Sequence, residues 1–208
     1  MMPILDLPAL DATPLTREPY DHMIVPGFIR AESRDAVTRD FPPIRKHGLF
    51  PLSVLRYGAA FTDLLGELEG PKFEAIVAAK FGVALAGLPK LFTVRGRCAM
   101  KDGKIHTDSL DKVVTLLLYL NSSWEAGGGR LRVLRSATNL SDYAAEIPPV
   151  AGTLLLFRRS ERSFHGHEPF IGERRAIQMN WMTDAASRDR EEARHRFSAR
   201  IKQFVPFA

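Results

Sequence analysis

Two side chains that could share one metal ion stand two positions apart, at His106 and Asp108. In an extended chain, residues i and i+2 point to the same side, so both side chains can reach one ion while Thr107 points away. An imidazole and a carboxylate are two of the three ligands in a facial metal triad, which leaves coordination positions open. The same short pattern also occurs on surface loops, where the two side chains only bond each other.

A third ligand would have to come from a distant segment. The stretch SFHGHEP at 163–169 offers His165 and His167, and one more imidazole would complete a triad of two histidines and one carboxylate. Two arginines follow, Arg174 and Arg175. Because a guanidinium group can hold a carboxylate through two parallel hydrogen bonds, the order of these residues predicts a metal site beside an anchor for an anionic molecule.

Strands are needed to position these residues, and the chain changes character near residue 90. The first part predicts a short strand at 20–28, a helix at 31–39 and helical spacing at 59–81 with a break at Gly70-Pro71. The second part predicts strands at 91–100, 113–120, 130–134, 153–157 and 174–182, and a closing helix from Thr183 or Asp184 towards Lys202. Helices followed by several short strands indicate a mainly β, α+β fold of the sandwich or jelly-roll type.

The length of 208 residues suits one domain with a sizeable core. We therefore expect a single domain over 1–208. Within it, 1–90 would be a helical N-terminal support, 91–183 the β core and 184–208 a C-terminal helix.

The formal net charge is +5, and arginines are dense in SRDREEARHRFSARIK near the C-terminus. This run could attract an anionic partner, but Asp189, Glu191 and Glu192 interrupt it, which favours a solvated helix of mixed charge. No stretch approaches the run of about 20 apolar residues that a membrane span needs. The start has no basic-then-apolar leader, and Cys98 is the single cysteine, so we expect a cytoplasmic protein without an internal disulfide.

Residues 91–183 resemble the prolyl 4-hydroxylase-like branch of the 2-oxoglutarate/Fe(II)-dependent dioxygenase superfamily. The shared features are His-x-Asp, a strand ending in Tyr119-Leu120-Asn121, a Gly-Gly-x-Leu-Arg strand, a Pro-x-x-Gly turn, His-x-x-x-Pro and the arginine. The resemblance implies a double-stranded β-helix, a jelly roll of cupin-like form. It also implies Fe(II), 2-oxoglutarate and O₂, with ascorbate as a candidate reductant, and hydroxylation of a C–H bond with release of succinate and CO₂.

The resemblance also assigns roles at the expected iron site. His106, Asp108 and His165 would hold the metal and carry catalysis, and His165 is preferred over His167 because Pro169 follows it by four residues. His167 would then be a neighbour of the site.

Arg174 fits the family's Gly-x-Arg placement for the 2-oxoglutarate anchor. Strand alternation supports it, because Arg174 would share a polar face with Gln178 and Asn180. Arg175 stays a rival, since Trp181 follows it by six residues as in many relatives.

Two further residues are candidate cosubstrate contacts. The hydroxyl of Tyr119 matches a position that often bonds the cosubstrate carboxylate, or else Tyr119 is a core aromatic. Arg97 stands where relatives often have a tyrosine near the cosubstrate. It would share a strand face with Arg95, so either arginine could meet an anion or face solvent.

Two alternatives differ in function. A nucleic-acid demethylase of the same superfamily would suit the positive charge. Those demethylases have two arginines several residues apart after the distal histidine, whereas Arg174 and Arg175 are adjacent here, so nucleic acid is an unlikely partner. A jelly-roll binding module with a structural metal would lack the open coordination and the arginine anchor. The sequence indicates neither the substrate, which could be a protein side chain or a small molecule, nor the oligomeric state. Specificity is expected in the loops 122–129, 135–147 and 158–163.

Overall fold

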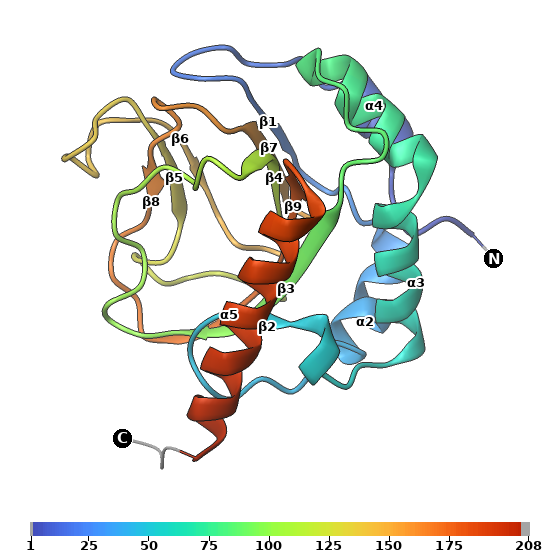
Figure 1. The fold of residues 1–208 in the computed structure, drawn as a ribbon, viewed down its shortest axis with the longest axis vertical. Helices are drawn as coiled ribbons and strands as arrows, with labels where there is room; N and C mark the ends of the chain where they lie inside the picture. The colour runs from blue at the N-terminus through green and yellow to red at the C-terminus, as the bar shows by residue number, and fades with distance from the viewer. Residues whose placement is uncertain (1, 205–208) are drawn as a thin grey trace.

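Two antiparallel sheets form the centre of the protein in the computed structural model, which describes residues 2–204 (Figure 1). Within this range the larger sheet has the strand order β1-β7-β4-β9-β3-β2 and the smaller sheet the order β6-β5-β8. The strands of the larger sheet are β1 (His22–Val25), β2 (Phe50–Pro51), β3 (Lys90–Cys98), β4 (Lys112–Tyr119), β7 (Leu154–Arg158) and β9 (Gly172–Met182). The smaller sheet contains β5 (Leu131–Leu134), β6 (Tyr143–Ile147) and β8 (His165–Gly166).

Strand β4 lies inside the larger sheet and explains why the run VVTLLLYL is almost continuously apolar. It pairs with β7 along one edge and β9 along the other, and its two faces are covered by two separate hydrophobic cores. Val114, Leu116 and Leu118 point to the outer face of the sheet, where they join the main core. The alternate residues from Thr115 to Tyr119 point between the two sheets. A second core fills that space with Tyr119, Leu131, Val133, Ile147, Leu155 and Phe157.

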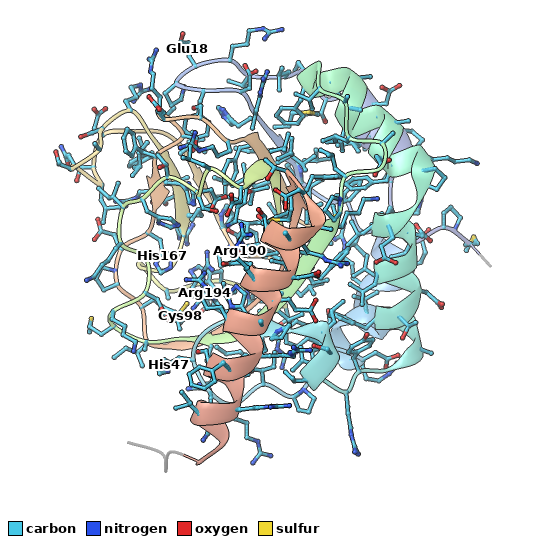
Figure 2. The ribbon with its side chains drawn as sticks, in the orientation of Figure 1. Glu18, His47, Cys98, His167, Arg190 and Arg194 are labelled. Carbon is cyan, nitrogen blue, oxygen red and sulfur yellow. The ribbon has the colours of Figure 1, made fainter. Side chains whose placement is uncertain are left out.

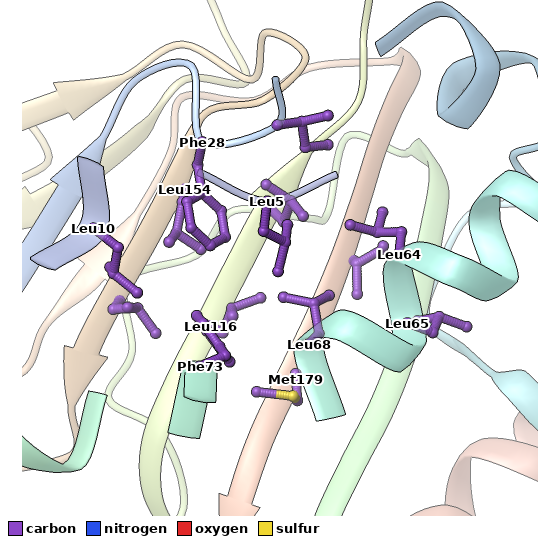
Figure 3. Packing of buried hydrophobic residues seen from close by; sticks show 14 of the residues in the cluster. Leu5, Leu10, Phe28, Leu64, Leu65, Leu68, Phe73, Leu116, Leu154 and Met179 are labelled. Carbon is purple, nitrogen blue, oxygen red and sulfur yellow. The ribbon is translucent and has the colours of Figure 1, made fainter. Parts of the chain in front are cut away.

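Helices cover the outer face of the larger sheet. They are α1 (Leu7–Ala12), α2 (Ala31–Arg39), α3 (Ala59–Glu69) and α4 (Pro71–Phe81), with a short 3₁₀ turn at Leu52–Val54. Figure 3 shows Leu64, Leu68 and Phe73 of these helices packed towards the side chains of Leu116 and Met179. A long final helix, α5 (Ala185–Phe204), crosses in front of β9 and β3 (Figure 1). None of the helices between residues 2 and 204 has both the length and the apolar character that a membrane span requires.

The observed elements agree closely with the sequence pattern. The α+β class is confirmed, the helix at 31–39 has the expected bounds, and the break between α3 and α4 falls at Gly70. Asp184 caps α5 by accepting a hydrogen bond of 2.8 Å from the backbone N–H of Ser187. The short strand expected at 20–28 is confirmed as β1, and the N-terminal part also adds β2, which was not expected, to the larger sheet.

The prediction of a loop over 135–147 is partly wrong. The end of the segment 135–147 forms β6, which pairs with β5 at the edge of the smaller sheet. Tyr143 and Ala144 are exposed, so this edge strand lacks the apolar alternation that identifies a strand in a sequence.

The contact between α4 and the sheet gives a stability prediction. Phe73 is fully buried, with its ring centroid 6.0 Å from that of Trp181 and 5.9 Å from that of Phe28. We expect Phe73→Ala to lower the free energy of unfolding by about 3–5 kcal/mol, because it removes this packing and leaves a cavity. Phe73→Leu should cost less. Denaturant unfolding followed by circular dichroism measures both.

The matched control is Phe197→Ala, since Phe197 is 68% exposed on α5. It should change the unfolding free energy by no more than about 0.5 kcal/mol. Equal losses for Phe73→Ala and Phe197→Ala would contradict the packing that we describe.

Candidate metal centre

His106, Asp108 and His165 come together at one end of the space between the sheets. One possible ligand atom from each lies within 4.8 Å of the others. A pair of backbone hydrogen bonds fixes this arrangement. The N–H of His106 donates to the carbonyl of His165 at 3.1 Å, and the N–H of His165 donates to the carbonyl of His106 at 3.0 Å. The segment before β4 is thereby tied directly to β8, and the two imidazole rings lie 4.3 Å apart.

The hydrogen bonds of the two imidazoles leave the same nitrogen free on each ring. Nδ1 of His106 lies 2.9 Å from the carbonyl oxygen of Lys104, and Nδ1 of His165 lies 3.0 Å from that of Ser163. A carbonyl oxygen only accepts, so in each neutral ring Nδ1 carries the proton and Nε2 keeps its lone pair. Histidines that bind metals are commonly oriented in this way.

Asp108 offers a buried, ionised carboxylate. It is 6% exposed and accepts hydrogen bonds from Lys112 Nζ at 2.7 Å and from Thr115 Oγ1 at 2.5 Å. Burial alone would raise the pKa of Asp108. The positive charge of Lys112, the neighbouring His165 and these two hydrogen bonds outweigh burial and lower that pKa to about 2.

His165 is neutral near pH 7. Burial lowers the pKa of His165 to about 4, and the nearby His106 acts in the same direction, against the opposing effect of Asp108. Two imidazole nitrogens and one carboxylate, with His165 and Asp108 already in the protonation states that bind metals, fit a divalent iron ion.

His167 lies near these residues but outside the group. It is buried, and its Nδ1 lies 2.8 Å from the carbonyl oxygen of Glu168. Burial lowers the pKa of His167 to about 4, with a further lowering from Arg174. The two-residue spacing between His165 and His167 would put them on one side of a regular strand, but β8 ends at Gly166. The structure therefore groups His165 with His106 and Asp108, whereas His167 only lines the cavity beside them.

A cavity of about 470 Å³ opens beside the three residues. Its floor consists of side chains that alternate inwards along β4 and β9, including Thr115, Leu117, Gln178 and Asn180. Arg174 lies in the same cavity and is 4% exposed. The metal-ligating group and this buried guanidinium group therefore share one cavity.

Two hydrogen bonds hold Arg174 in place. Its Nε donates to the carbonyl of Gly129 at 2.8 Å, and its Nη2 donates to the hydroxyl of Tyr119 at 3.2 Å. Nη1 has no hydrogen-bond partner among the described residues, so it is available to a bound anion. Tyr119 is fully buried, and its ring lies beside the guanidinium group of Arg174.

Arg175 points to the other side of β9, as strand alternation requires. It forms an ion pair of 3.0 Å with Glu173 and lies over the ring of Phe41. Further along that face, Ile177 and Trp181 enter the main core. Of the two adjacent arginines, the structure places Arg174 in the cavity and Arg175 outside it.

The expected pairing of Arg95 and Arg97 on one strand face is wrong. Arg95 lines the cavity and forms an ion pair of 2.9 Å with Asp102, whereas Arg97 is exposed and lies outside the cavity. The pairing of β3 with β9 shifts its register between these two residues, because the single Gly96 of β3 lies opposite both Arg174 and Arg175 of β9, a β-bulge whose extra residue belongs to β9. This irregularity turns Arg97 away, and a cosubstrate-binding role for Arg97 has no geometric support.

Side chains of α5 also line the cavity, which sequence reasoning missed. Glu191, Arg194 and His195 reach it from the helix, and Figure 2 labels two of the cavity-lining residues, Arg194 on α5 and His167. Glu191 pairs with both Arg194 and His195 along the helix. These pairs agree with a helix of mixed charge, and periodicity alone could not show which residues face the cavity.

The comparisons with known proteins cover the same part of the chain. The model of the 2OG-Fe(II) oxygenase superfamily matches residues 97–183, which include the three candidate ligands and Arg174. No curated protein sequence matches the chain significantly.

Similar solved structures include a Pseudomonas putida prolyl-4-hydroxylase, at 18% identity and a TM-score of 0.54, covering 78% of this chain and 92% of that one. A viral collagen prolyl hydroxylase from Paramecium bursaria Chlorella virus-1 has 14% identity and the same TM-score, with 76% and 93% covered. HygX from Streptomyces hygroscopicus, solved with nickel and 2-oxoglutarate, has 13% identity and a TM-score of 0.51, with 77% and 81% covered.

These findings confirm what the sequence motifs predict at the level of the family. The jelly-roll fold and the resemblance to prolyl 4-hydroxylase-like oxygenases are confirmed, and the family match agrees with the expected enzyme class and its use of Fe(II) and 2-oxoglutarate. The structural likeness, at low identity, shows the fold, and the match over residues 97–183 supports the resemblance to the family.

The choice between the two histidines can be tested by metal binding. We expect His165→Ala to weaken Co²⁺ binding by at least about a hundredfold, because removal of a direct ligand should exceed the usual effect of a residue that only supports one. His167→Ala should change the affinity only a few-fold. Calorimetric titration of the metal-free protein with Co²⁺ measures both.

Thermal melts of both variants control for folding. The reverse order of affinities, with His167→Ala losing the metal and His165→Ala keeping it, would show that His167 is the third ligand.

Proposed function

We propose that this chain, whose residues 97–183 match the model of the 2OG-Fe(II) oxygenase superfamily, hydroxylates an unactivated C–H bond of its substrate. The observation that carries the proposal is the shared cavity. It contains a group of two imidazoles and one carboxylate, together with a buried arginine whose Nη1 is unpaired among the described residues. A structural metal site would need neither the cavity nor the arginine.

His106, Asp108 and His165 would hold the iron. When bound, iron with 2-oxoglutarate and O₂ supplies the oxidising chemistry of this family, and the protein supplies position and exclusion of water. The Nδ1 bonds to backbone carbonyls keep both imidazoles aimed at one point. Thr115 and Lys112 restrict the carboxylate of Asp108, because each of its oxygens accepts one of their hydrogen bonds.

Arg174 and Tyr119 would bind the distal carboxylate of 2-oxoglutarate. Arg174 offers its unpaired Nη1 and a positive charge in a buried place, where a charge-assisted hydrogen bond is strong. The hydroxyl of Tyr119 accepts from Arg174, so its own proton is free for the carboxylate. Burial raises the pKa of Tyr119, despite the opposing effect of Arg174, and so keeps this hydroxyl protonated.

The overall reaction would consume one substrate, one 2-oxoglutarate and one O₂. One oxygen atom would enter the hydroxylated product and the other succinate, with release of CO₂. A protein side chain or a small molecule could supply the C–H bond, and ascorbate could keep the iron reduced. The cytoplasmic location indicated by the single cysteine stays a prediction.

Turnover of 2-oxoglutarate tests the proposed reaction. We expect the purified protein with Fe²⁺, 2-oxoglutarate, O₂ and ascorbate to form succinate slowly without substrate, and faster with a substrate from a panel of peptides and amino acids. Chelation of the metal should stop succinate formation. Asp108→Ala is the matched variant, because it removes one expected ligand and should reduce the rate to the level of the chelated protein.

Other outcomes favour the two alternatives. Formaldehyde release from a methylated oligonucleotide would identify a demethylase. No iron-dependent succinate across the panel, with metal still bound, would identify a binding module.

The two arginines can be separated by their effect on cosubstrate affinity. We expect Arg174→Ala to raise the dissociation constant of 2-oxoglutarate about 10- to 100-fold, because a hydrogen bond to a charged group contributes about 1.5–3 kcal/mol. Arg174→Lys should recover part of this loss by keeping the charge. Arg175→Ala should leave the constant within about twofold, since Arg175 points away from the cavity. Calorimetry with Co²⁺-loaded protein measures the three variants.

A thermal melt shows whether Arg174→Ala remains folded. A folded Arg174→Ala protein with unchanged 2-oxoglutarate affinity would refute the anchor.

A further inference from the structure

The paired strands β3 and β9 carry arginines to both sides of the larger sheet. On one side Arg95 and Arg174 line the cavity of the candidate metal centre. On the other side Arg97 and Arg175 line a separate depression. Strand alternation separates Arg174 from Arg175, and the bulge opposite Gly96 separates Arg95 from Arg97. The proposed hydroxylation uses only the arginines of the first side, so the second pair is unexplained.

Four arginines surround this second depression, which we call the arginine depression. Its volume is about 340 Å³. The four arginines that line it are Arg39, Arg45, Arg97 and Arg175. The size lies in the usual range for a small-molecule site. Arg39 comes from the end of α2 and Arg45 from the segment that follows it, so three separate parts of the chain supply the positive groups.

Nearby carboxylates neutralise only part of this charge. Glu173 pairs with Arg175, and Asp40 lies 3.3 Å from Arg39. Arg45 and Arg97 are exposed and have no hydrogen bond or ion pair from their side chains to any residue within 2–204. Four positive and two negative groups leave a local excess of two positive charges.

The geometry is held by contacts that do not use the unpaired arginines. Gly96 lies so close to Ile44 that a Cβ atom at position 96 would come within 2.6 Å of it. Arg175 lies over the ring of Phe41, and its Nη1 donates to the backbone carbonyl of Thr38 at 3.4 Å. These contacts hold the walls of the depression in place, and Arg45 and Arg97 remain available.

We propose that the arginine depression is a second anion site, which binds a small phosphate ester or diphosphate. Guanidinium groups form paired hydrogen bonds with phosphate oxygens and keep their charge at all physiological pH values. A doubly charged phosphate group matches the local excess of charge, and the volume of about 340 Å³ suits a small ligand. The site lies back to back with the expected 2-oxoglutarate site and does not depend on it.

Calorimetric titration of the metal-free protein with inorganic pyrophosphate tests this site. We expect the double variant Arg45→Ala/Arg97→Ala to bind pyrophosphate at least about tenfold more weakly than the unmodified protein, because charge-assisted hydrogen bonds are lost. Both residues are exposed and unpaired, so the variant should keep its melting temperature. The control Arg158→Ala/Arg162→Ala removes two exposed arginines elsewhere and should bind like the unmodified protein.

Further variants separate this site from the candidate metal centre. Arg174→Ala should leave pyrophosphate binding within about twofold, whereas loss of binding in that variant would place the anion in the first cavity and overturn the proposal. Equal weakening in both double variants would show only a general effect of charge. Binding of an oligonucleotide without measurable binding of pyrophosphate would also overturn it. Succinate formation is measured separately, so failure here leaves the proposed hydroxylation intact.

Discussion

The backbone pair between His106 and His165 is the contact on which the candidate metal centre depends. Each residue donates its N–H to the carbonyl of the other, which joins the segment before β4 of the larger sheet to β8 in the smaller one. Since β8 in turn pairs with β5, the position of His165 relative to His106 follows from the closure of the two sheets. The residues are far apart in sequence, and only this closure brings their imidazoles to 4.3 Å.

The buried charge of Asp108 is the second constraint on the centre. An ionised carboxylate is stable in a buried place only when it is paired or hydrogen-bonded, and here Lys112 and Thr115 meet this requirement. Thr115 also lies 3.0 Å from Asn180 Oδ1, so one side-chain network joins Asp108 to the cavity floor on β9. The same floor leads to Arg174. The polar face of the two central strands therefore connects the metal-ligating group to the anchor.

Much of this arrangement could be predicted because it follows from local geometry. Alternation along an extended strand is sufficient to separate Arg174 from Arg175, and the apolar run at 113–120 marks the central strand. The features that sequence could not provide depend on distant partners. The bulge opposite Gly96 arises where β3 meets β9, and it reverses the direction that simple alternation predicts for Arg97. Strand β8 has two residues and no apolar pattern, so only its partner β5 defines it.

On the outer face of β9, the apolar packing against the helices ends next to a charged residue. Ile177, Met179 and Trp181 are buried under α3 and α4, but the same face ends in Arg175. A guanidinium group resists complete burial because removal from water is costly without a partner. Packing therefore stops where Arg175 begins, and the end of the strand pair stays accessible beside Arg97. Arg97 and Arg175 therefore lie where the apolar cover ends, and they contribute the positive charge of the surface next to it.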